Sequence, residues 1–142
     1  MVSAFVHEHF IPFQANVTDP VERLAFRRFG AIWTPSIIIL NSEGMERYRI
    51  EGFLTTREFH AQLAMALARI IAMRKRWADA EPHYARIVEQ FGDTAAAPEA
   101  LYWRGVSAYQ GRSDHTALVK MAIEMKQKYP ASEWAIKAAV WG

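Results

Sequence analysis

A proline stands at the entrance to the most apolar run of the chain. Trp33, Thr34 and Pro35 come just before four consecutive apolar residues, Ile37 to Leu40. A proline that opens a strand gives up a ladder hydrogen bond, and its tertiary amide lowers the cost of a cis peptide bond to about 0.5–1 kcal/mol. An uninterrupted apolar run is typical of a strand covered on both faces, as in the parallel part of an α/β sheet. The pattern therefore predicts a cis Thr34–Pro35 bond that leads into a buried strand.

The composition is that of an ordinary globular protein. The chain has 142 residues, of which 51% are apolar and 23% charged, and this length is near the usual size of one domain. The net charge of +2 is too small to indicate nucleic-acid binding. No apolar run reaches the roughly 18 residues that span a membrane, and the first residues lack the pattern of a signal peptide. We therefore expect a soluble, cytoplasmic protein that binds neither nucleic acid nor membranes.

Helix and strand signals alternate before the Thr34–Pro35 turn. Val2 to Phe10 show apolar residues at helical spacing, and Ile11 to Val17 alternate apolar and other residues with the period of a strand. Pro12 favours an edge position for that strand, because it has no backbone N–H. Asp19 and Pro20 are typical of a helix start, so a helix is predicted from Pro20 to Phe29, ending at Gly30.

A hairpin and a long helix are predicted after the turn. Asn41 to Gly44 have the composition of a hairpin turn, and Met45 to Glu51 form the return strand. Thr55 to Glu58 read as a capping box that starts a helix running to about Ile71. Residues 1–76 are thus predicted to form an α/β domain with about three strands.

The order helix, strand, helix, strand, strand, helix resembles the C-terminal two-thirds of a thioredoxin-like domain, from Val2 to Arg74. Trp33-Thr34-Pro35, the Asn41–Gly44 hairpin and Ile50-Glu51-Gly52-Phe53 carry the resemblance. The resemblance implies an additional central strand followed by a Cys-x-x-Cys pair. This sequence has no such strand segment before the first helix, and it contains no cysteine. Thiol–disulfide exchange requires a thiolate, so we expect the chain to be redox-inactive and not an enzyme.

Without the central strand, the segment Ile11–Val17 and the strand Ser36–Leu40 would each lack a partner. Each buried unsatisfied backbone group costs about 1–3 kcal/mol, so an empty slot is not stable. The two strands could pair directly, a segment of a second copy could fill the slot, or the missing residues could lie upstream of this chain. We expect direct pairing or a homodimer through the open strand edge.

Residues 77–142 are predicted to be entirely helical. Four amphipathic segments begin near Trp77, Ala97, Asp114 and Ser132, and Gly or Pro lies near the ends of the first three. Equivalent helix ends stand 38 residues apart, at Gln90 and Lys128. Small-residue, aromatic and proline positions resemble those of a tetratricopeptide repeat, although the period exceeds the usual 34 or so. The fold class is therefore α/β followed by all-α: a truncated thioredoxin-like domain at 1–76 and degenerate tetratricopeptide-like hairpins at 77–142.

Candidate functional residues occur in both parts. Extended-peptide binding beside the cis-proline would use Trp33, Thr34 and Pro35, whereas their structural role would be to pack over the sheet and shape a turn. In the helical part, the residues expected to face a tetratricopeptide-like groove are Tyr102, Tyr109 and Gln110, and aromatic residues at helical spacing also serve as core.

No catalytic, cofactor or metal site is expected. His7 and His9 are two apart on a helix and point to different sides. We therefore expect a non-catalytic scaffold that binds a peptide or protein partner. The alternative is a fragment of a thiol–disulfide oxidoreductase whose Cys-x-x-Cys segment lies upstream of this chain.

Overall fold

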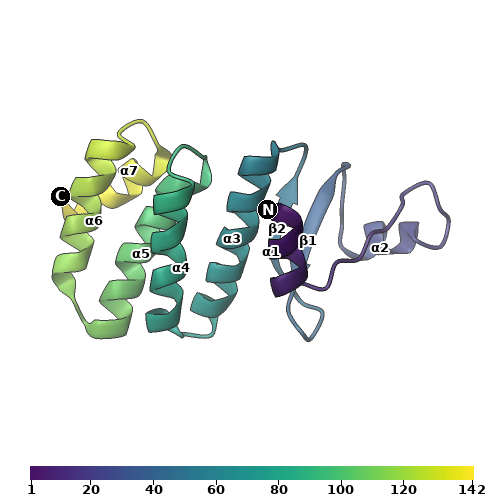
Figure 1. Ribbon diagram of the computed structural model, residues 1–142, viewed down its shortest axis with the longest axis horizontal. Coiled ribbons are helices and arrows are strands. Elements are labelled where there is room, and N and C mark those ends of the chain that lie inside the picture. The colour runs from purple at the N-terminus through teal and green to yellow at the C-terminus, as the bar shows by residue number, and fades with distance from the viewer. The chain divides into compact units, whose positions relative to one another are not determined.

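The computed structural model describes all 142 residues and divides into two compact units, Met1–Thr56 and Arg57–Gly142 (Figure 1). The sequence pattern predicts a boundary between residues 76 and 77, and the units separate earlier than that. The reason is that the long helix after Thr56 contributes its buried face and several polar contacts to the helical unit. Each unit is described below by itself.

The first unit contains two short helices and one hairpin. Helix α1 spans Val2–His9 and α2 spans Arg23–Arg28, followed by strands β1, Ser36–Leu40, and β2, Glu46–Glu51. The strands form an antiparallel two-stranded sheet. Ile37 faces Ile50 and Ile39 faces Tyr48, and the register shifts between Ile39 and Leu40.

Local sequence signals set the hairpin and α2. Gly44 has a φ of 75°, and its N–H donates to the Asn41 carbonyl at 3.0 Å, which closes the predicted turn. The Asp19 carboxylate accepts from the N–H groups of Val21 and Glu22, at 2.8 and 3.0 Å. Residues 20–22 form turns, so α2 is shorter than the helix predicted from Pro20 to Phe29.

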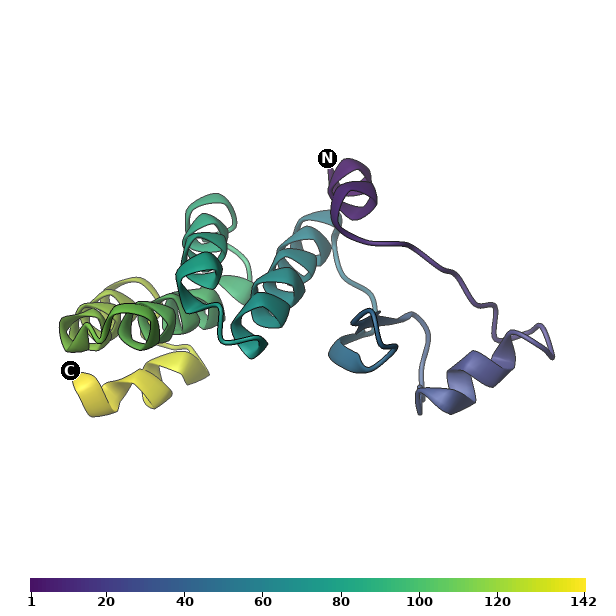
Figure 2. The ribbon, with the colours of Figure 1, turned by 90° about the horizontal axis from the view of Figure 1, so that it is seen from below.

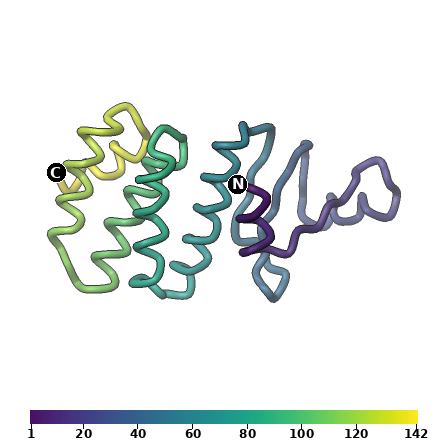
Figure 3. The backbone as a smooth tube through the Cα atoms, viewed as in Figure 1, coloured from purple at the N-terminus to yellow at the C-terminus, as the bar shows by residue number.

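The strand predicted at Ile11–Val17 is not formed, and its direct pairing with β1 is absent too (Figure 3). Ile11 is 99% exposed and Phe13 is 83% exposed. The sheet therefore has two strands rather than about three. A hairpin closes a short loop, whereas pairing across a crossover must close a longer one at a greater cost in entropy. The apolar residues of Ile11–Val17 alternate as in a strand, but this alternation does not specify a strand for them to pair with.

The second unit is a set of helices joined by short turns (Figures 1 and 2). In chain order they are α3 Thr56–Met73, α4 Trp77–Gln90, α5 Ala96–Arg112, α6 His115–Lys128, α7 Glu133–Ala138 and the 3₁₀ helix η1 Ala139–Trp141. The predicted N-caps hold: Asp114 accepts from the Thr116 N–H at 3.0 Å, and Ser132 accepts from the Ala135 N–H at 3.1 Å. The Arg74–Arg76 turn separates α3 from α4, with Lys75 at a φ of 58°.

The core of the helical unit combines many alanines with a few large side chains. Tyr84, Met65, Ile87, Leu101, Met121 and Met125 are almost fully buried. Helices α5 and α6 come close together at Gly105, where an added Cβ would lie 2.6 Å from the Cβ of Met121. Only glycine fits this contact. None of the helices combines the length and apolar character that crossing a bilayer requires.

Candidate functional site

The Thr34–Pro35 turn is exposed and held on both sides. The Thr34–Pro35 peptide bond is cis, and the Trp33 side chain is 68% exposed. The Ser36 hydroxyl donates to the Trp33 carbonyl at 2.6 Å, and the Gly52 N–H donates to the Pro35 carbonyl at 2.9 Å. Trp33, Thr34 and Pro35 thus lie together at the entrance to β1, and none of them is covered by the rest of the chain.

The hydrogen bond at Pro35 sets which backbone groups of β1 face away from β2. Hydrogen-bonded pairs recur at every second residue of an antiparallel ladder. Since Pro35 and Gly52 form such a pair, Ile37 and Ile39 also direct their backbone groups toward β2. The N–H and C=O groups of the remaining residues, Ser36, Ile38 and Leu40, therefore point to the outer edge of β1. No third strand pairs with that edge.

The two edges of this small sheet differ in charge. By the same alternation, β2 presents Arg49 and Glu51 at its outer edge, up to the register shift. Arg49 forms ion pairs with Glu46 at 2.7 Å and with Glu51 at 3.5 Å. Hydrogen bonding to Glu46 raises the pKa of the Arg49 guanidinium, and the same bond lowers the pKa of the Glu46 carboxyl. Charged edges resist pairing with other strands, so the uncharged edge of β1 is the open one.

Several large apolar side chains of the first unit are exposed to solvent. They are Ile11, Phe13, Val21, Leu24, Ile32, Trp33, Leu40, Met45 and Phe53. Scattered exposed apolar residues are normal, but this first unit exposes many of them in a short segment.

The candidate residues on α5 are engaged within the helical unit. The Tyr102 ring lies 5.1 Å from the Trp134 ring and 5.8 Å from the Trp141 ring, so it packs the C-terminal helices onto α5. The Tyr109 ring lies 5.0 Å from the ring of His115, at the start of α6. Tyr109 is half-buried and Gln110 is exposed. Trp33, Thr34 and Pro35 belong to the first unit and these three residues to the second.

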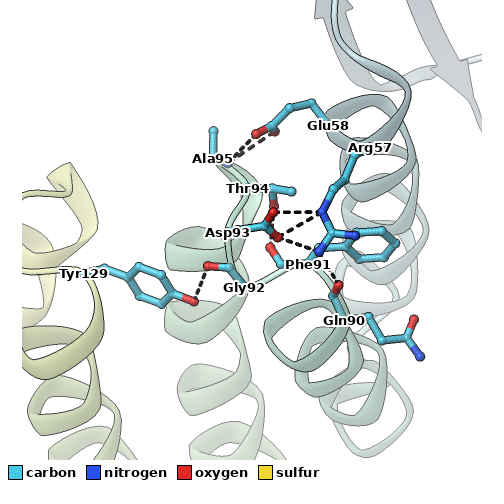
Figure 4. A network of polar contacts seen from close by, with 9 residues as sticks. All are labelled: Arg57, Glu58, Gln90, Phe91, Gly92, Asp93, Thr94, Ala95 and Tyr129. Atoms are coloured by element: carbon cyan, nitrogen blue, oxygen red, sulfur yellow. Dashed lines mark hydrogen bonds and ion pairs between the residues drawn. The ribbon is translucent and has the colours of Figure 1, made fainter.

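The sequence patterns did not predict the polar network at the N-terminus of α3 (Figure 4). The Arg57 guanidinium donates to the Asp93 carboxylate at 2.5–3.0 Å and to the Gln90 carbonyl at 2.8 Å. The Glu58 carboxylate accepts from the Ala95 N–H at 3.1 and 3.2 Å. Hydrogen bonding to Arg57 lowers the pKa of the Asp93 carboxyl. The network fixes the first turn of α3 to the α4–α5 loop.

The same loop is also held from the other side. The Tyr129 hydroxyl donates to the Gly92 carbonyl at 2.9 Å (Figure 4). The Arg57 guanidinium lies 5.3 Å from the centre of the Phe91 ring, a cation–π contact. No local sequence signal could reveal these contacts, since the partners lie more than thirty residues apart. These contacts join α3 and α6 to the α4–α5 loop.

One carboxylate of α5 is largely buried. Burial raises the pKa of Glu99, and Arg69 of α3, 3.7 Å away, opposes that shift. No group of three His, Asp or Glu side chains is arranged to hold a metal ion. His7 and His9 both lie on α1, where His9 is 3.8 Å from Glu8.

Comparison with protein families agrees with the resemblance in the N-terminal part. No curated protein and no solved structure matches the chain. The matched family is described as a thioredoxin-like domain, and the match covers residues 2–67, from the start of α1 into α3. The tetratricopeptide-like pattern of the helical unit remains an interpretation of the sequence. Residues 2–67 are therefore similar to a thioredoxin-like domain, and the sheet within them consists of β1 and β2 alone.

Proposed function

We propose that this chain is a non-catalytic scaffold that binds an extended segment of a peptide or protein at the outer edge of β1. The observation that carries the proposal is the contrast between the two sheet edges: β1 offers unpaired backbone groups and no charge, whereas β2 carries Arg49 and Glu51 at its outer edge. An added strand would pair with Ser36, Ile38 and Leu40. Main-chain hydrogen bonds supply the affinity in this mode of binding, and side chains at alternate positions supply the specificity.

The turn before β1 extends this surface. Trp33 is exposed next to the cis bond, and a tryptophan ring offers a large apolar face to a docking segment. Thr34 and Pro35 are exposed beside it, at the point where the bound segment would enter. The three residues thereby form one end of the proposed binding edge.

The helical unit would supply further protein contacts. If its hairpins are tetratricopeptide-like, Gln110 and the exposed side of Tyr109 would face the partner. Tyr102 would contribute through packing, because its ring contacts the rings of Trp134 and Trp141. This unit is therefore the secondary part of the proposal.

A second candidate function is favoured by the thioredoxin-like match: these residues could be part of a thiol–disulfide oxidoreductase. The 142 residues hold no cysteine, so the nucleophile would have to come from residues upstream of Met1. The genomic DNA before Met1, read in frame for an apolar strand followed by Cys-x-x-Cys, separates the two functions.

Binding of a synthetic probe tests the scaffold proposal. The probe is a fluorescein-labelled peptide of alternating valine and threonine, and the readout is fluorescence polarisation. Its matched control carries N-methyl groups at alternate residues of the pairing edge, which removes donors from the peptide and leaves the protein unchanged. We expect the unmethylated peptide to bind at least about tenfold more tightly, because several backbone hydrogen bonds are lost.

Two protein variants locate the site. Ile38→Pro removes an N–H that points to the outer edge and leaves the bonds between β1 and β2 in place, so it should weaken binding. Met45→Ala changes an exposed side chain in the hairpin turn and should not. Equal binding of the methylated and unmethylated peptides would overturn the proposal, whatever Ile38→Pro does to folding.

A further inference from the structure

Residues 11–15 carry the alternating sequence pattern of a strand but have no partner. They lie outside any helix, turn or sheet, and no hydrogen bond joins their backbone groups to the rest of the chain. The segment from Ile11 to Val17 contains no charged residue and alternates apolar positions with Pro12, Gln14 and Asn16. Ile11 and Phe13 are almost fully exposed. The first unit thus contains an unpaired apolar strand sequence as well as an unpaired apolar edge at β1.

Pro12 fixes which side of this segment can pair. A proline within a sheet must turn its nitrogen away from the ladder, because it has no N–H to donate. With Pro12 outward, Gln14 and Asn16 are outward too, and the backbone groups of Phe13 and Ala15 face the partner strand. Asn16 already donates its N–H to the Glu22 carboxylate, at 2.7 Å, which agrees with an outward position.

We infer that residues 11–17 of a second copy occupy the outer edge of β1, and that the exchange is reciprocal. This inference rests on the proposed function, since it requires that the β1 edge accepts a strand. Each copy supplies a strand for the open β1 edge of the other. A twofold dimer therefore pairs both edges and closes without further growth. Both pairing elements are uncharged, and no like charges meet between them.

A pair of proline variants on one segment tests the inference. Ala15→Pro removes an N–H that should face the partner, and Gln14→Pro removes one that should face outward. Size-exclusion chromatography with light scattering, over a range of concentrations, gives the dimer dissociation constant. We expect a dimer for the native chain and Gln14→Pro, and a dissociation constant raised at least about tenfold in Ala15→Pro. A native chain that stays monomeric, or equal effects of the two variants, would overturn the inference.

Complementation distinguishes this exchange from pairing between two β1 strands. Ala15→Pro leaves the β1 edge intact, and Ile38→Pro leaves residues 11–17 intact. A mixture of the two variants should therefore form a heterodimer with one complete junction, although each variant alone is impaired. Pairing of β1 with β1 of the second copy predicts no effect of Ala15→Pro and no rescue in the mixture. Circular dichroism of each variant confirms that the helical unit remains folded.

A peptide separates failure of this inference from failure of the proposed function. The labelled peptide Phe10–Thr18 should bind Ala15→Pro, whose β1 edge is free, and lose affinity when its Ala15 is N-methylated. If the valine–threonine peptide binds at β1 while the native chain is monomeric, the scaffold proposal stands and the dimer is refuted. If neither peptide binds and no dimer forms, both are refuted.

Discussion

The two units of this chain satisfy their backbone groups in different ways. An α-helix makes its hydrogen bonds within one segment, so the helices from α3 to α7 need each other only to bury side chains. A strand depends on a neighbour along each edge, and the sheet of the first unit has one neighbour for each of its two strands. The comparison shows that a helical unit can be complete over a short length of chain, while a sheet with few strands remains open to partners.

Apolar side chains follow the same contrast. The helical unit buries Leu101 and Met125 completely, whereas the first unit leaves Phe13 and Phe53 more than four-fifths exposed. Helices α5 and α6 also leave no room for a side chain at Gly105. The first unit therefore leaves large apolar side chains exposed, and the second gathers its apolar side chains in a core.

The largest expected effect compares a buried leucine with an exposed phenylalanine. Leu101 is 0% exposed, so Leu101→Ala should lower the free energy of unfolding by about 3 kcal/mol, through lost burial and the cavity left behind. Phe53 is 84% exposed, and Phe53→Ala should change the free energy by less than about 0.5 kcal/mol. Urea unfolding followed by circular dichroism and tryptophan fluorescence measures both. Similar losses in the two variants would show that the first unit has a core of its own.

Two glycines of α5 test how tightly the helices interlock. Gly105→Ala places a Cβ 2.6 Å from the Met121 Cβ, and the overpacking should outweigh the gain in helix propensity, with a net loss of about 1 kcal/mol. At Gly111 an added Cβ would lie 3.4 Å from its nearest neighbour, so Gly111→Ala should be neutral or stabilising. Thermal unfolding gives the comparison. If both variants gain stability, α5 and α6 are packed more loosely than the structure shows.

Two carboxylates of the helical unit should respond to pH with opposite signs. Hydrogen bonding to Arg57 lowers the pKa of Asp93 below its usual 3.8, so its stabilising contribution is complete above that pH and is lost as the pH falls through the lowered pKa. Burial raises the pKa of Glu99 above its usual 4.5, so its contribution is present below that pH and is lost as the pH rises through the raised pKa.

Variants of the two carboxylates test these opposite pH dependences of stability. Relative to the native chain, Asp93→Asn should lose stability at pH 7 and approach native stability in acid. Glu99→Gln should compare more favourably with the native chain at pH 7 than at pH 4. Thermal unfolding between pH 2 and 7 supplies both curves. Curves that shift in the same direction would contradict the assignment of opposite causes, hydrogen bonding for one group and burial for the other.

The smallest expected effect concerns the thioredoxin-like region itself. The chain contains no cysteine, so the reduction of insulin by dithiothreitol should proceed at the same rate with and without it. Turbidity from the precipitating insulin chains is the readout, and a thioredoxin with its Cys-x-x-Cys pair is the positive control. Faster reduction in the presence of this chain would contradict the prediction, because it would require catalysis without a thiolate.

Local signals in the sequence predicted most of the helices, the hairpin and the caps at Asp114 and Ser132. These features depend on residues close together in the chain, such as a cap and the N–H groups just after it. The same reasoning proposed a strand at Ile11–Val17, which the structure does not form. The Arg57–Asp93 network was also missed, since its partners are distant in sequence. Of the site residues, the sequence placed Trp33, Thr34 and Pro35 at one turn but left open whether Trp33 is covered. It also left open whether Tyr102 faces a groove or packs in the core, and its ring packs against Trp134 and Trp141.

By itself the sequence determined the hairpin, most of the helices, the absence of a thiol and the place of the turn at Pro35. Only the tertiary structure decided which backbone groups are left without partners, and therefore that the outer edge of β1 is open while that of β2 is charged. The physical reason is that side-chain period and turn residues act over a few positions, whereas the pairing of a strand depends on which segment reaches its edge.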